Sequence, residues 1–102
     1  MNTLRITLEY NCYPVWILDS DGNIIDNDLP ADIRANQELD DLFVKIQTLF
    51  DACFIDTAKE FTACGFNTDD EKASFLKLVE EADKWLRQEA DGKYLVENHV
   101  NF

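Results

Sequence analysis

The stretch LDSDGNIIDNDLP carries four aspartates and two asparagines, a density of oxygen ligands that suits a hard cation such as Ca²⁺. Asp19, Asp21 and Asn23 fall at positions 1, 3 and 5 of a calcium-binding loop. In that register position 6, which needs glycine, is Ile24, and position 12, which needs a bidentate glutamate, is Pro30. A loop that starts at Asp21 fails in the same way, so we expect no calcium site here.

A tight turn explains the same residues better. Asp21-Gly22 lies between two apolar runs, and Asp-Gly in that setting is a strong hairpin signal because glycine adopts positive φ without strain. The sequence therefore predicts a β-hairpin whose tip is Asp21-Gly22.

Cysteine and histidine offer little metal chemistry. The three cysteines, Cys12, Cys53 and Cys64, are an odd number without C-x-x-C spacing, which is typical of a reducing compartment. A zinc site would need all three together with His99, and a small buried apolar role suits Cys53 and Cys64 better. We expect no metal and no cofactor.

Candidate catalytic groups are also few. Ser20 belongs to the predicted turn and Ser74 to a predicted helix, and neither has the surroundings of a nucleophile elbow. His99, the only histidine, stands beside Glu97 on a predicted strand, a setting more typical of a satisfied histidine than of a general base. Phosphate-binding glycine loops are absent. We expect a protein that is not an enzyme.

Length and composition indicate one globular domain over residues 1–102, because 46% of the residues are hydrophobic and the chain can bury a core of its own. No apolar run approaches the roughly 18 residues of a membrane span. A basic start followed by an apolar stretch is not visible, so we expect no signal peptide and a cytoplasmic location.

Strand patterns dominate the first quarter of the chain. Residues 4–10 alternate between apolar and polar side chains, which predicts a half-buried strand. Residues 15–18 are continuously apolar and predict a strand that is apolar on both faces. Residues 23–27 follow the turn as a short hairpin partner, and residues 61–66 and 94–102 predict two further strands. The alternative to the strand at 61–66 is that the preceding helix continues through Ala58.

Helix patterns fill most of the rest. Apolar residues recur at steps of three and four from Leu39 to Phe54, which predicts an amphipathic helix, preceded by a short turn at 30–35. Thr68 and Glu71 form a capping box for a second helix, which Gly92 terminates as a C′ glycine.

The predicted order is strand, strand, strand, helix, strand, helix, strand (βββαβαβ). Two apolar helix stripes need a cover, and half-apolar strands provide one. We therefore expect an α+β fold: a two-layer sandwich with a mainly antiparallel sheet and both helices on one face.

Negative charge is the most distinctive property of the chain. Twenty-one acids and nine bases give a net charge of −12, which disfavours nucleic acid and anionic membranes as partners and favours a basic protein. Residues 19–41 hold eight acids against one base, a local charge of −7. Residues 69–91 also hold eight acids, but four bases interleave with them, so pairing along a helix explains that segment.

The acids that we predict to contact a partner lie in the unbalanced segment. They are Asp19, Asp21, Asp26, Asp28, Asp32, Asp40 and Asp41. Trp16 is added on a condition: if helices cover Val15 and Ile17, Trp16 and Leu18 lie on the open face as an aromatic anchor among acids. The alternative is a central strand that is covered on both sides.

The stretch YNCYPVWILDSDGNIIDNDLP resembles the N-terminal part of small acidic immunity proteins from bacterial polymorphic toxin systems, including contact-dependent growth inhibition. The resemblance covers about the first third of the chain, through an aromatic-Pro-x-Trp hairpin strand, a glycine turn and a Leu-Pro helix start. It implies a cytoplasmic antitoxin, monomeric or weakly dimeric, that binds and blocks one cognate toxin domain, often a basic nuclease. An acidic nucleic-acid mimic that inhibits a DNA- or RNA-binding protein is the alternative.

Overall fold

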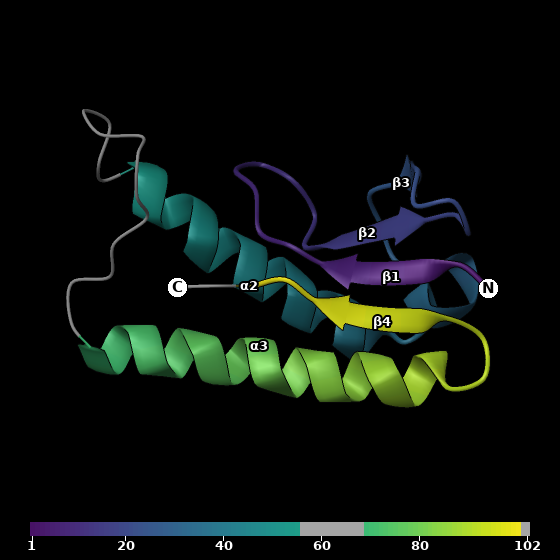
Figure 1. Ribbon diagram of the computed structural model, residues 1–102. Coiled ribbons are helices and arrows are strands. Elements are labelled where there is room, and N and C mark those ends of the chain that lie inside the picture. Colours follow the sequence, from purple (N-terminus) through teal and green to yellow (C-terminus); the bar gives the residue numbers. More distant parts are fainter. Residues whose placement is uncertain (56–68, 101–102) are drawn as a thin grey trace.

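The computed structural model describes residues 1–55 and 69–100, and in these residues the chain forms an α+β fold (Figure 1). The predicted strand at 61–66 and Thr68 of the predicted capping box lie outside the described residues. The elements, in chain order, are β1 (Thr3–Ile6), β2 (Val15–Leu18), β3 (Ile24–Asp26), α1 (Ala31–Arg34), α2 (Gln37–Ile55), α3 (Asp69–Ala90) and β4 (Leu95–Asn98).

The four described strands form one sheet in the order β3-β2-β1-β4 (Figure 1). Two hairpin-like pairings are antiparallel, β1 with β2 and β2 with β3, whereas β4 runs parallel to β1. The sheet is therefore mixed: two of its three described pairings are antiparallel, as expected of a mainly antiparallel sheet, and the parallel position of β4 is the detail that the sequence did not predict. The parallel pair follows from the connection: the chain passes through the helices before it returns beside β1, and such a crossover brings strands together in the same direction.

Pro30 starts a helical turn, as the sequence predicts, and the structure forms a four-residue helix, α1, directly after it. Proline has no N–H to leave unpaired and its φ of −57° already suits a helix start. Ile33 points from this helix into the core, and its burial stabilises the short helix.

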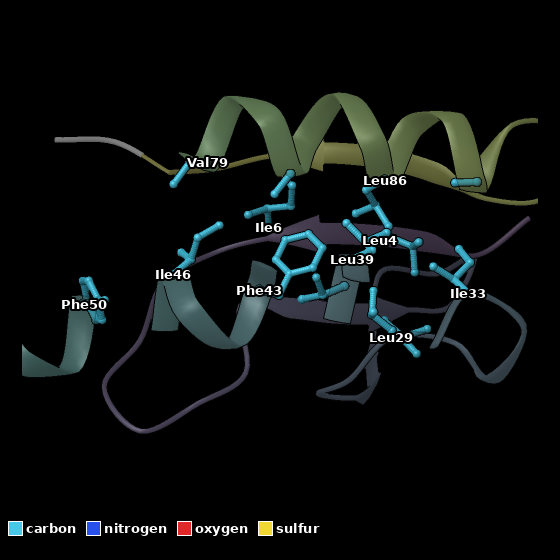
Figure 2. Packing of buried hydrophobic residues seen from close by; sticks show 14 of the residues in the cluster. Leu4, Ile6, Leu29, Ile33, Leu39, Phe43, Ile46, Phe50, Val79 and Leu86 are labelled. Atoms are coloured by element: carbon cyan, nitrogen blue, oxygen red, sulfur yellow. The ribbon is translucent and has the colours of Figure 1, made fainter. Parts of the chain in front are cut away.

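The core lies between the sheet and the two long helices. Figure 2 shows side chains of β1, α2 and α3 converging on Phe43 of α2, which is fully buried. The predicted stripe of α2 is confirmed at Leu39, Phe43, Ile46 and Phe50. Leu49, which the spacing assigned to the same stripe, is 39% exposed. The stripe of α3 is confirmed by the buried residues Phe75, Val79, Ala82 and Leu86.

The end of α3 has the geometry that the glycine signal predicts. Gly92 has φ of +74°, and the N–H groups of Lys93 and Tyr94 donate to the carbonyl of Ala90. These bonds pair a carbonyl at the helix end and turn the chain toward β4. β4 ends at Asn98, before the end of the predicted strand at 94–102, and Val96 in the strand and Val100 after it pack against the edge of the core.

Core packing yields the first prediction. Phe43→Ala should lower the free energy of unfolding by about 3–5 kcal/mol, because the ring is fully buried and its removal leaves a cavity beside Tyr13, whose ring centroid is 6.0 Å away. Val44→Ala is the matched control: its side chain is 49% exposed on the next position of the same helix, and it should change stability by less than about 0.5 kcal/mol. Urea titration followed by circular dichroism measures both. Equal losses would contradict the described core.

Candidate functional site

The tip of the β2–β3 hairpin is organised by Asp19. Its carboxylate Oδ1 accepts the N–H groups of Asp21 at 3.0 Å and Asn23 at 2.9 Å. The backbone closes the same turn, since Gly22 N–H donates to the Asp19 carbonyl at 3.1 Å and Asp19 N–H donates to the Asn23 carbonyl at 2.9 Å. Gly22 has φ of +87°, so the predicted hairpin turn is confirmed.

These hydrogen bonds give the Asp19 charge a structural role. The N–H of Asn23 is the largest of several donors that favour the ionised carboxyl, and together they hold the pKa of Asp19 below its usual value. Asp19, the first residue of the apparent calcium pattern, thus accepts hydrogen bonds from the backbone of its own turn. Among residues 1–55 and 69–100, no three His, Cys, Asp or Glu side chains are grouped so that they could hold a metal ion.

Two of the predicted acids are paired with bases. Asp28 Oδ2 lies 2.6 Å from Nη1 of Arg34, and Asp32 Oδ2 lies 3.6 Å from Nζ of Lys93. Tyr94 also donates its hydroxyl to Asp32 at 3.1 Å, and its pKa is raised by desolvation and by this bond. Lys93 belongs to a distant part of the sequence, so the local count of −7 overstates the charge that this region presents.

Asp40 serves the interior more than the surface. Its Oδ1 accepts the hydroxyl of Tyr13 at 2.8 Å, and burial together with this bond raises the pKa of Tyr13 strongly. Tyr13 is also held by Asn27, which accepts the Tyr13 N–H at 3.0 Å and donates to the carbonyls of Tyr13 and Val15 at 2.7 and 2.9 Å. Asn27 therefore fixes the β3 end to the start of β2, a role that sequence analysis missed.

The remaining predicted acids are exposed. Asp21 stands at the hairpin tip, Asp26 ends β3 and accepts the N–H of Asn27, and Asp41 accepts a bond from Gln37 on α2. Among the described residues, no Lys, Arg or His forms an ion pair with Asp19, Asp21, Asp26 or Asp41. Glu38 and Asp40 also have no ion pair in the described part of the chain, so six carboxylates on the hairpin and at the start of α2 carry the unbalanced charge of the region.

Trp16 lies on the sheet face that points away from the core. Val15 and Ile17 are buried in the core cluster, and Trp16 is directed to the opposite side, where its Nε1 donates to the Thr7 carbonyl at 3.2 Å. The condition attached to Trp16 is therefore met, although its side chain is half-buried. Leu18 differs from expectation: it is only 2% exposed and offers no contact surface.

An open groove of about 410 Å³ lies on this face, lined by Arg5, Thr7, Glu9, Trp16, Ile24 and His99. The register explains the assembly, because Arg5 stands opposite Trp16 on one side and Glu97 on the other. Glu97 Oε1 lies 3.1 Å from Nε of Arg5 and 3.5 Å from Nε2 of His99. Sequence analysis did not name Arg5, Glu9 or Ile24 as site residues, although the alternation of residues 4–10 placed Arg5, Thr7 and Glu9 on one face.

Comparison with known proteins adds no family assignment: no family model matches the chain, and no curated protein matches it. None of the helices that the structure describes is long and apolar enough to cross a membrane.

The hairpin geometry predicts a conformation-specific effect at Gly22. Gly22→Val should lower the free energy of unfolding by about 1 kcal/mol or more, because a β-branched residue resists positive φ. A Cβ at this position meets no atom within 4 Å, so crowding contributes nothing. Gly22→Asn is the control and should cost less, since asparagine tolerates the left-handed region. Equal urea midpoints for valine and wild type would contradict the described turn.

The lowered pKa of Asp19 predicts a pH-dependent role in stability. A carboxyl whose pKa falls on folding stabilises the fold above its unfolded pKa of about 3.9 and loses that contribution as pH drops through the folded value. Wild type should therefore be more stable than Asp19→Ala at pH 7, and the gap should shrink below about pH 4. Denaturant titrations between pH 7 and 3 measure it, with Asp21→Ala as the control. A gap independent of pH would contradict the assigned role.

Proposed function

We propose that the protein is an immunity protein that binds a cognate bacterial toxin domain with a basic surface, such as a nuclease, and blocks it in the cytoplasm. The observation that carries the proposal is a set of exposed carboxylates on the hairpin and the start of α2 that have no cationic partner among the described residues: Asp21, Asp26 and Asp41. The resemblance of the first third of the chain to acidic immunity proteins supports the same conclusion.

Electrostatics suits this task. A protein of net charge −12 attracts a basic partner over a distance of about 10 Å at 0.1 M salt, and such steering raises association rates. An antitoxin gains from fast capture, because each free toxin molecule does damage until it is bound. Steering requires only a carboxylate surface, which is consistent with the expectation of a non-enzymatic, metal-free protein that is monomeric or weakly dimeric.

The conformation of the hairpin tip is fixed by hydrogen bonds, so its charged side chains are already in place before a partner binds. The Asp19 carboxylate accepts backbone N–H groups, which lower its pKa, and these same bonds fix the turn that carries Asp21. Preorganised charge costs less to bring into an interface than charge on a mobile loop. The acidic tip is therefore suited to act as a fixed feature of a binding surface.

Imitation of nucleic acid is the alternative that this arrangement supports less well. A mimic must present carboxylates in regular rows at the spacing of phosphates. Here the acids of 19–41 are spread over a hairpin and two helices, and Asp28 and Asp32 are already paired with bases. Recognition of one specific basic protein fits that distribution better.

Co-expression tests the proposal. Cells that produce candidate toxin domains from the same genome should grow when this protein is present, and the pair should bind in vitro. Neutralising the exposed acids in Asp21→Asn/Asp26→Asn/Asp41→Asn should slow association about tenfold at low salt, with a smaller effect at high salt.

A triple variant on α3 and its end, Glu80→Gln/Glu81→Gln/Asp91→Asn, is the matched control, because it removes the same number of exposed charges elsewhere. Equal slowing by both variants would show that overall charge, and not this surface, steers the partner. Failure to protect against any toxin domain, combined with inhibition of a DNA- or RNA-binding protein, would replace the proposal with the nucleic-acid mimic.

A further inference from the structure

We infer that the open face of the sheet, at the groove beside Trp16 and Ile24, is where a basic segment of the toxin docks. The inference rests on the proposed function and adds the contact surface to it. The groove is bounded by Arg5, Thr7, Glu9, Trp16, Ile24 and His99, all of them described residues, and it opens to solvent.

The sheet register creates this face, and neither long helix of the described part of the chain packs on it. Leu4, Ile6, Val15 and Ile17 share the face that packs against α2 and α3. Because side chains alternate along a strand, Arg5 and Trp16 must point the other way. The two long helices pack on the opposite face of the sheet, as Figure 2 shows.

Apolar surface is exposed at the groove in a form that suits a contact. Ile24 is 59% exposed on the short edge strand β3. The only polar atom of the Trp16 side chain, Nε1, donates to the Thr7 carbonyl, so the part of the side chain that faces the groove is apolar ring surface. An aromatic ring beside an aliphatic side chain is the usual composition of an interface hot spot, and the ring face also attracts cations.

The charge around the groove selects the sign of the partner. The guanidinium of Arg5 is matched by Glu97 at 3.1 Å, so an anion that approached Arg5 would have to displace a carboxylate. Glu9 lines the groove, is exposed, and has no ion pair with a base in the described part of the chain. The unmatched charge is therefore negative, which fits a lysine or arginine with an apolar neighbour on the partner.

A second copy of this chain fits the same face poorly. Ile24 belongs to the hairpin that also carries Asp19, Asp21 and Asp26, none of them ion-paired among the described residues. Two copies that met at this edge would bring these carboxylates together, and like charges at an interface oppose association. The same carboxylates attract a basic protein, so the hairpin discriminates between the two occupants.

Binding kinetics with a toxin domain that the wild-type protein neutralises tests the inference. Ile24→Ser and Glu9→Gln should each raise the dissociation rate at least tenfold, because each removes a contact inside the groove. Ile25→Ser is the matched control: its side chain is 56% exposed on the same strand but does not line the groove, and the dissociation rate should stay within twofold of wild type. Circular dichroism and thermal melting confirm that each variant is folded.

Wild-type dissociation rates for both groove variants would overturn the inference and leave the proposed function standing, because the toxin would still be neutralised. An equal effect of Ile24→Ser and Ile25→Ser would also overturn it, since the edge strand and not the groove would be the contact. Sedimentation velocity adds the remaining outcome: a wild-type dimer that Ile24→Ser dissociates would assign the face to a second copy. If no toxin domain binds the wild-type protein, the proposed function fails first, and the docking surface fails with it.

Discussion

Because β1 is pleated, its side chains point alternately to the two faces of the sheet. The core on one face and the groove on the other both depend on this alternation. Leu4 and Ile6 enter the core between the sheet and the long helices, whereas Arg5 points outward. Because β1 has β2 on one side and β4 on the other, its alternation is transmitted across the sheet. A shift of one residue in either pairing would bury Arg5 or expose Leu4, so burial of the core residues fixes the strand register. The same register places the residues of the outer face next to one another.

The acidic residues show how a chain of net charge −12 folds in spite of its own repulsion. Asp19 accepts backbone N–H groups in the turn, Asp40 accepts the hydroxyl of Tyr13, and Asp32 meets Lys93 from the far end of the chain. In each case a carboxylate that would otherwise repel other acids is stabilised by a donor or a base, and the interaction fixes the local geometry. Only the acids that remain outside such bonds are free to interact with a partner, and they are fewer than the composition suggests.

Local signals in the sequence predicted local structure well. The Asp-Gly turn, the apolar spacing of α2 and the glycine after α3 all depend on neighbours within a few positions, and the structure confirms each of them. The alternation of residues 4–10 is confirmed only in part, because β1 ends at Ile6 and Tyr10 is 51% exposed. Long-range features were beyond that reasoning. The parallel pairing of β4 with β1 joins residues 3 and 95, the Asn27 clamp spans fourteen positions, and the Asp32–Lys93 pair spans sixty-one. Such contacts are decided by how whole elements pack, which periodicity does not encode.

If the protein binds a basic partner as proposed, the two candidate surfaces have different roles in binding. Carboxylates on the hairpin and α2 act at a distance and are screened by salt, so they govern how fast a basic partner arrives. The groove beside Trp16 acts only on contact, where apolar area and a desolvated ion pair govern how slowly the partner leaves. Ile24 belongs to the hairpin and lines the groove, so the element that attracts the partner is also part of the surface that retains it. A partner drawn to the acidic tip therefore arrives next to the groove and has only a short distance to search before it docks.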